Sequence, residues 1–209
     1  MKQRDIFKAF IEERFDENRS SEIMQKFDQL FELLVETNSQ INLFSRKADV
    51  ADLWTLHFLD SLLILDIDGA NTKLDKKVIC DLGTGGGLPG IPLAIIFPQS
   101  KVVMMDRVLK KLTAIQKIWT KLGLKNCDYI HTRIEDAPHT YRHYFDILVS
   151  RALKILPEFV PPLSKIVKPQ GKIFLYKSLI LDDCEQFDKK ILHNVSRDFL
   201  GERIIVEIN

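Results

Sequence analysis

The segment DLGTGGGLPG, residues 81–90, restricts most strongly how this chain can fold. Five of its last eight residues are glycines, which can adopt positive φ and let another group approach the backbone closely. Pro89 suits the first turn of a helix. Because the apolar run KVIC precedes this segment and IPLAIIF follows it, we expect a turn between a buried strand and a helix. In doubly wound sheets, the first such turn is the usual ligand cradle.

Short apolar runs after residue 76 indicate further strands of the same sheet. The segments between them can hold helices, as in PLAIIF and RVLKKLTAIQKIWTKLG, which predicts a mostly parallel α/β sheet covered on both faces. A helix is expected near LDDCEQFDKK, and LHNVSRDFL and RIIVEI then predict a closing antiparallel hairpin. The predicted parallel strands are KVICDLG, KVVMMD, CDYIHTR, FDILVSRA and GKIFLYKS.

Residues 1–70 have a different, helical pattern of apolar residues. Ile23, Phe27, Leu30 and Leu34 fall on one helix face, with a cap expected at Ser20 or Ser21, and a second helix is expected from Asp49 through LWTLHFLDSLLIL. We therefore predict a helical extension over 1–70, packed on an α/β domain over 71–209 as one compact unit.

The composition mainly excludes certain ligands, sites and locations. The 209 residues include 30 Lys and Arg against 29 Asp and Glu, a net charge of +1, so any binding to phosphate requires a local basic cluster. The three cysteines form no CxxC motif, which argues against disulfides and zinc and fits a reducing cytoplasm. No apolar run has the length of a signal peptide or a membrane-spanning helix. We expect a cytoplasmic monomer without a metal or a membrane partner.

Two ligand classes fit the glycine segment. GGGLPG matches the dinucleotide fingerprint GxGxxG, with Asp106 at the next strand end able to hold a ribose, which would indicate an NAD-dependent oxidoreductase. S-adenosylmethionine is the alternative, with Asp81 and Gly85 contributing to its site and Asp106 holding its ribose. Asp81 would repel a pyrophosphate, whereas it is compatible with an ammonium and a sulfonium. The acid and the hairpin therefore favour S-adenosylmethionine.

Several segments together resemble the RsmG (GidB) family of bacterial 16S ribosomal RNA methyltransferases. They occur in the family's order over nearly the whole chain, and HFLDSL and LGTGGGLPGIP are specific to that family. The matching segments are NLFSR at 42–46, HFLDSL at 57–62, DLGTGGGLPGIPLA at 81–94, MMDR and VLKK within 104–111, RIE at 133–135, FDILVSRA at 145–152, LYK at 175–177 and RIIVEI at 203–208.

The resemblance implies a class I methyltransferase fold, with a Rossmann-like sheet, and methyl transfer from S-adenosylmethionine to N7 of one guanine in 16S ribosomal RNA or the small subunit. It also implies cofactor contacts from Gly83, Leu88, Ile134, Glu135 and Arg151. Guanine N7 carries a free lone pair, so we assign no general base.

Basic residues at the predicted ligand edge and in two basic clusters are candidates for RNA contacts, although such cations are often only solvated. HFLDSL has two interpretations, either a polar seam under the extension or a border of the RNA entry. A metal pair at His139 and His143 would require a helix there and lacks a third ligand, so none is expected. A non-catalytic RNA-binding assembly factor with this fold remains an alternative. The candidate RNA contacts are Arg46, Lys47, Lys110, Lys111 and Lys177.

Overall fold

The computed structural model describes residues 2–45 and 49–209. Its centre is a seven-stranded sheet in the order β3-β2-β1-β4-β5-β7-β6. The first five strands are parallel, whereas β7 lies antiparallel between β5 and β6. The predicted sheet and closing hairpin are confirmed. The strands are β1 (Val78–Leu82), β2 (Lys101–Asp106), β3 (Cys127–His131), β4 (Phe145–Arg151), β5 (Val167–Lys177), β6 (Lys190–Asn194) and β7 (Ile204–Ile208).

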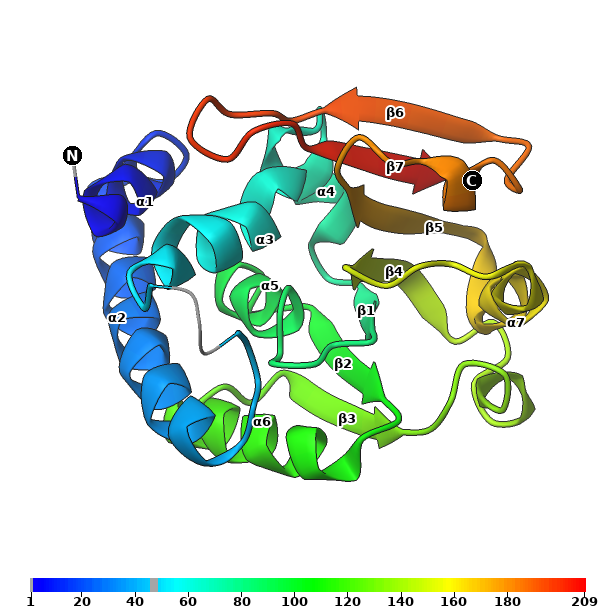
Figure 1. Ribbon diagram of the computed structural model, residues 1–209, viewed down its shortest axis with the longest axis horizontal. Coiled ribbons are helices and arrows are strands. Elements are labelled where there is room, and N and C mark those ends of the chain that lie inside the picture. Colours follow the sequence, from blue (N-terminus) through cyan, green and yellow to red (C-terminus); the bar gives the residue numbers. More distant parts are fainter. Residues whose placement is uncertain (1, 46–48) are drawn as a thin grey trace.

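Helices cover both faces of this sheet, with α1 and α2 along one side of the molecule and α7 on the other (Figure 1). None of the described helices is long and apolar enough to cross a membrane. The α-helices are α1 (Gln3–Glu12), α2 (Glu17–Gln40), α3 (Asp60–Leu62), α4 (Ala70–Leu74), α5 (Gly90–Ile96), α6 (Leu109–Lys121) and α7 (Val160–Ile166).

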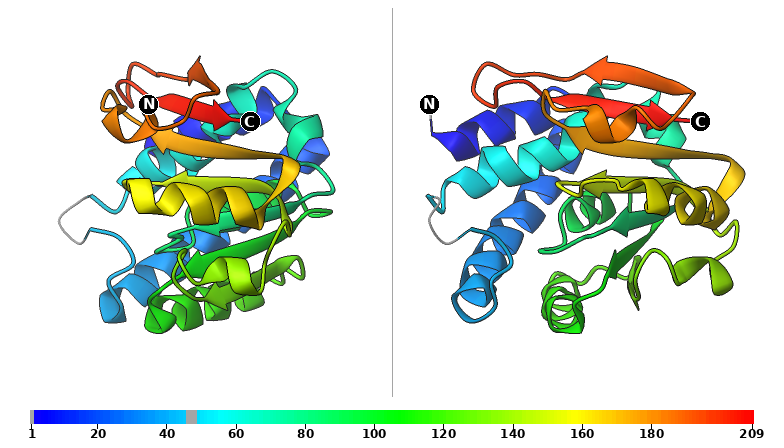
Figure 2. Two further views of the ribbon diagram at one scale, coloured as in Figure 1. Left: turned by 90° about the vertical axis from the view of Figure 1, so that its right-hand side faces the viewer. Right: turned by 45° about the vertical axis from the view of Figure 1, so that its right-hand side comes forward.

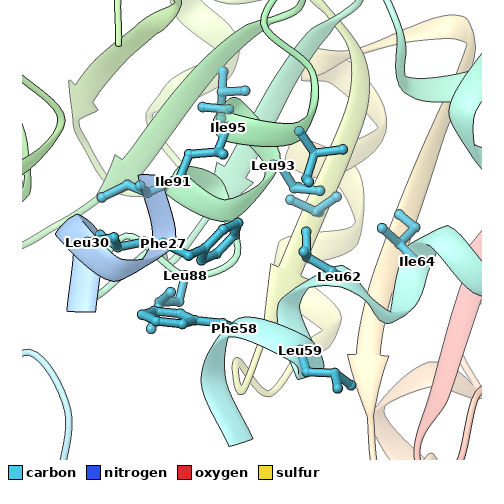
Figure 3. Close-up of a cluster of buried hydrophobic side chains, with 14 of the residues drawn as sticks. Phe27, Leu30, Phe58, Leu59, Leu62, Ile64, Leu88, Ile91, Leu93 and Ile95 are labelled. Atoms are coloured by element: carbon cyan, nitrogen blue, oxygen red, sulfur yellow. The ribbon is translucent and has the colours of Figure 1, made fainter. Parts of the chain in front are cut away.

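Successive side chains along each strand point to opposite faces of the sheet, so the core has two layers. On β1, Ile79 belongs to the cluster that contains α1, α2, α5 and α6, whereas Cys80 belongs to the cluster under α7. Phe27 of α2 and Phe58 pack in the first cluster beside Ile91 and Ile95 of α5 (Figure 3). The N-terminal helices and the sheet therefore share one core, while the division at residue 70 stays a prediction.

Three local expectations differ from the structure. Helix α2 begins at Glu17 and is capped by Asp16, whose carboxylate accepts a bond from the Arg19 amide, so the cap predicted at Ser20 or Ser21 is wrong. The helix over HFLDSL exists but changes pitch from π-helical over Leu53–Leu59 to α3 and then to a 3₁₀ turn over Leu63–Asp66. Near LDDCEQFDKK only a 3₁₀ turn forms, over Asp182–Cys184.

Tertiary contacts account for the missing helix. The buried carboxylate of Asp183 accepts bonds from the Lys177 ammonium and from the Ile155 amide, at 2.5 and 2.7 Å. These bonds hold the segment as a turn against the ends of β4 and β5, and the chain then continues into β6 at the sheet edge (Figure 2).

Candidate functional site

The glycine turn follows β1 and is tied to the end of β2. Gly83 and Gly85 have φ of 71° and 53°, which other residues rarely adopt. The Gly83 amide donates to the carbonyl of Met105 at 2.8 Å, and the Gly85 amide donates to Oδ2 of Asp106 at 3.0 Å. Two strand ends therefore fix the turn, and Asp106 is the acid that joins them.

A cavity of about 380 Å³ opens beside this turn. Five of the predicted cofactor residues line it, from three different strand ends, and Lys111 lines it as well. The buried Ile134 gives it an apolar wall, and Glu135 and Asp106 bring carboxylates. These five residues are Gly83, Gly85, Asp106, Ile134 and Glu135.

Asp81 lies beneath the turn and does not line this cavity. Its Oδ2 accepts bonds from the Thr84 hydroxyl at 2.6 Å and from the Gly90 amide at 2.8 Å, so it fastens the turn to the start of α5. Its buried Oδ1 has no hydrogen-bond partner among residues 2–45 and 49–209. Burial raises the pKa of this carboxyl to about 6, although the bonds from Thr84 and Gly90 oppose the shift.

Gly87 and Gly90 serve packing. A Cβ at Gly87 would lie 2.6 Å from the Ile91 side chain, and one at Gly90 would lie 2.7 Å from Oδ2 of Asp81. Neither glycine lines the cavity. The last two glycines of the GxGxxG pattern thus reflect close packing around the start of α5, and the buried Asp81 carboxylate would oppose a pyrophosphate at this helix start.

Leu88 and Arg151, both predicted to contact the cofactor, lie outside the 380 Å³ cavity. The Leu88 side chain packs in the hydrophobic cluster near Phe58 (Figure 3). Arg151 ends β4 and its guanidinium turns toward HFLDSL, where it donates to Asp60 at 2.8 Å. Their cofactor contacts stay predictions.

The segment HFLDSL meets the tail of the chain at Asp60. One carboxylate oxygen of Asp60 accepts from Arg151 and the other accepts from Nε of Arg203 at 2.7 Å, while Nη2 of Arg151 lies 3.3 Å from Nδ1 of His57. Ser61 is fully buried and donates to the His57 carbonyl at 2.6 Å. Burial and the Arg151 charge lower the pKa of His57 to about 4. These contacts form a polar seam, and a border of the RNA entry at this motif stays a prediction.

Arg203 was not among the predicted site residues, although it begins the RIIVEI segment of the family pattern. Ala152 was missed as well. It follows Arg151 with φ of 60°, an uncommon conformation for a residue with a side chain, and such residues concentrate at functional sites. No signal in the sequence indicates this backbone conformation.

The predicted RNA-contact residues do not form one group. Lys110 lies with Lys117 and Lys121 along a groove between α2 and α6, whereas Lys111 lines the 380 Å³ cavity. The Lys177 ammonium is nearly buried, at 2.5 Å from Asp183 and 3.1 Å from the Leu153 carbonyl, so its charge is already neutralised. Arg46 and Lys47 lie outside the described residues.

The histidine pair at 139 and 143 lacks the helix that a metal pair would need. His139 ends a 3₁₀ turn, and His143 has φ of 50° with its Nδ1 2.9 Å from the Val167 carbonyl. The described part of the chain holds no group of three potential metal ligands.

Comparison with known proteins identifies the family. The model of the GidB family, rRNA small subunit methyltransferase G, matches residues 23–200. The chain belongs to this methyltransferase G family. Members from Bacteroides fragilis and Bacteroides thetaiotaomicron, each named ribosomal RNA small subunit methyltransferase G, are 36% and 34% identical to it. The alignments cover 86% and 88% of this chain and 87% and 89% of those proteins.

Solved structures show the same fold at low sequence identity. A SAM dependent methyltransferase from Aquifex aeolicus superposes with a TM-score of 0.52 at 16% identity, over 72% of this chain and 98% of that one. A mutant of MtNAS in complex with S-adenosylmethionine gives 0.62 at 14% identity, over 91% and 77%. The predicted class I methyltransferase fold is therefore confirmed, and membership of the methyltransferase G family favours S-adenosylmethionine over NAD.

Proposed function

We propose that this protein transfers a methyl group from S-adenosylmethionine to N7 of a guanine in 16S ribosomal RNA. As a member of the methyltransferase G family it is an S-adenosylmethionine-dependent ribosomal RNA methyltransferase. The observation that carries the proposal is the 380 Å³ cavity, which brings Gly83, Gly85 and Asp106 together with Ile134 and Glu135 in a chain of this family.

The cavity has the groups that this cofactor requires. Within residues 2–45 and 49–209, each carboxylate oxygen of Asp106 accepts one hydrogen bond, from the Gly85 amide and from the Val108 amide. Each oxygen therefore keeps a lone pair for a ribose hydroxyl. The buried Ile134 offers an apolar face to an adenine, and Glu135 can accept from its amino group. Beneath the turn, the charge of Asp81 and its unsatisfied Oδ1 favour a cationic ligand nearby.

Guanine N7 sets modest chemical demands on the protein. Bound S-adenosylmethionine supplies a methyl group on a sulfonium, which the N7 lone pair attacks in line without prior loss of a proton. The residues around the cavity therefore act by alignment, which can contribute about 7–11 kcal/mol, and by keeping water away while positive charge moves. No residue has to act as a general base.

The substrate of this reaction is an RNA, which places the proposed site of action in the cytoplasm, where the three free cysteines would stay reduced. We also propose that the protein acts as a monomer, because its cofactor cavity is built within a single chain.

Titration calorimetry and mass spectrometry test this function together. Purified protein should bind S-adenosylmethionine and not NAD, and should raise the N7-methylguanine content of 16S ribosomal RNA taken from cells that lack the gene. Tight NAD binding without S-adenosylmethionine binding would instead indicate an oxidoreductase. Cofactor binding without methyl transfer to RNA or small subunits would indicate a non-catalytic assembly factor.

A further inference from the structure

Asp60 lies between two arginines that come from opposite parts of the chain. Its carboxylate accepts from Nη1 of Arg151 at 2.8 Å and from Nε of Arg203 at 2.7 Å. All three side chains are largely withdrawn from solvent, with exposed fractions of 10% for Asp60, 14% for Arg151 and 28% for Arg203. One carboxylate thus neutralises only one of two partly buried guanidinium groups.

A second cavity, of about 160 Å³, lies against this cluster. Asp60 is the only acid among its lining residues, whereas Arg151, Arg203 and Lys177 are basic. Asp183 neutralises Lys177, and His57 is uncharged at neutral pH because its pKa is lowered to about 4. Its lining side chains together with Asp183 therefore carry a surplus of one positive charge, although the charge of the buried Asp81 also acts on Arg151. Such a surplus attracts an anion more strongly in a partly buried site than in open solvent.

Arg203 has a donor available for such an anion. Its Nε donates to Asp60 and its Nη1 donates to the Glu202 carbonyl, while Nη2 donates to no atom of the described residues. Pairing with Asp60 fixes the guanidinium plane, so an anion in the cavity meets a preorganised donor.

The two cavities lie on either side of the chain that leaves β4. Arg151 and Ala152 line the second cavity, and Leu153 lines the cofactor cavity. The positive φ of Ala152 marks the turn between them. A nucleotide whose base reaches the cofactor cavity across this turn would bring its backbone phosphate close to Arg203.

We propose that the cavity at Asp60, Arg151 and Arg203 binds a backbone phosphate of the RNA substrate beside the target nucleotide. Arg203 is its direct cationic contact, and Asp60 is a positioning residue that holds the guanidinium in place. The inference rests on the proposed function, because it assumes an RNA substrate. The carboxylate of the cofactor has similar chemistry, so the test separates the two sources of the anion.

Arg203→Gln removes the charge and leaves Asp60 paired with Arg151. Arg197→Gln is a matched control, because Arg197 lies in the same tail and pairs with Asp66 at 2.7 Å but does not line the cavity. Arg203→Lys keeps the charge and loses the planar donor group. Binding to 16S ribosomal RNA is measured from 50 to 200 mM salt with S-adenosylhomocysteine present, roughly the range over which phosphate contacts are resolved, and S-adenosylmethionine affinity is measured by calorimetry.

We expect Arg203→Gln to weaken RNA binding about tenfold at low salt and to reduce the slope of log K against log salt by about one. Arg203→Lys should keep the wild-type slope. Arg197→Gln should match the wild type in both, and all three variants should bind S-adenosylmethionine normally.

Equal RNA binding by Arg203→Gln and Arg197→Gln, with methylation by the wild type intact, would overturn the phosphate site alone. Weaker S-adenosylmethionine binding by Arg203→Gln with an unchanged salt slope would assign the cavity to the cofactor carboxylate and overturn the proposal. If the wild type neither bound nor methylated the RNA, the proposed function would fail along with it.

Discussion

The backbone amide of Gly85 donates a hydrogen bond to the carboxylate of Asp106, 3.0 Å away. The acid at the end of β2 therefore shapes the turn after β1, in addition to the ribose contact proposed for it. A change at this position should affect both the ligand contact and the loop that forms the cavity wall.

Asp106→Ala should weaken S-adenosylmethionine binding at least tenfold, because it removes a charge-assisted acceptor, whose bonds contribute about 1.5–3 kcal/mol, and frees the Gly85 amide. Asp106→Asn should fall between this variant and the wild type, since its amide oxygen still accepts. Asp128→Ala, an exposed residue of the neighbouring β3, is the control. Calorimetry checks all three, and equal affinity in Asp106→Ala would remove Asp106 from the site.

The buried Asp81 predicts a pH dependence of stability. Its folded pKa of about 6 lies above the ordinary aspartate value of 3.8, so the folded protein binds the proton more tightly than the unfolded chain. Stability from this group is greatest below pH 4 and falls as the pH rises to about 6. Asp81→Asn lacks this loss and should gain on the order of 3 kcal/mol relative to the wild type between pH 4 and pH 7.

Urea unfolding of both proteins at several pH values measures this difference. Comparing the two proteins cancels the other titrating groups, including Asp146 and Glu207, whose pKa values are lowered and act in the opposite direction. If the difference in unfolding free energy between the two proteins stayed constant across the pH range, burial would not raise the pKa of Asp81.

Gly90 and Gly201 are glycines for different reasons, the first for lack of space and the second for its positive φ. A Cβ at Gly90 would lie 2.7 Å from Asp81 Oδ2 and 2.9 Å from Met104, so Gly90→Ala should cost about 1–3 kcal/mol by overpacking and disturb the cofactor turn. Gly201 has φ of 68° and open space around it, so Gly201→Ala should cost only about 1–2 kcal/mol of backbone strain and leave cofactor affinity unchanged. Thermal unfolding and calorimetry distinguish these results.

Lys110 tests the basic face of α6 without touching the cofactor cavity. Lys110→Glu should weaken binding to 16S ribosomal RNA several-fold at roughly 50 mM salt. The effect should be smaller at 200 mM, because added salt weakens contacts with phosphate over roughly this range. Lys8→Glu, on the exposed face of α1, is the control. Equal salt dependence in both variants would exclude Lys110 from the RNA surface.

Most of the fold could be predicted from local patterns. Strands with β-branched runs and the glycine turn after β1 depend on short-range physics, as does the placement of Asp106 at a strand end. Among the residues that line the cofactor cavity, Asp106 and the glycines of the turn follow from strand ends meeting at one sheet edge, whereas Ile134 and Glu135 are predicted only through the family resemblance. The helix expected near residue 184 does not form, because Asp183 accepts hydrogen bonds from Lys177 and Ile155. Local helix propensity carries no information about such tertiary bonds.

The second cavity could not be predicted in the same way. Asp60 and Arg203 are separated by 143 residues, and nothing in either local sequence indicates that they pair. Likewise, Leu88 follows the glycines directly, yet its side chain packs in the core. Long-range pairing and side-chain direction decide these positions.

The ion pairs Asp60 with Arg203 and Asp66 with Arg197 have a consequence for the order of assembly during synthesis. The residues that line the cofactor cavity have all been made once the chain reaches residue 159, whereas Arg203 follows 44 residues later. Because early segments of a growing chain fold first, the cofactor cavity can form on a nascent protein. The cavity at Asp60 is complete only after Arg203 has been made. A chain truncated before residue 203 would therefore have the cofactor cavity and lack the proposed phosphate site.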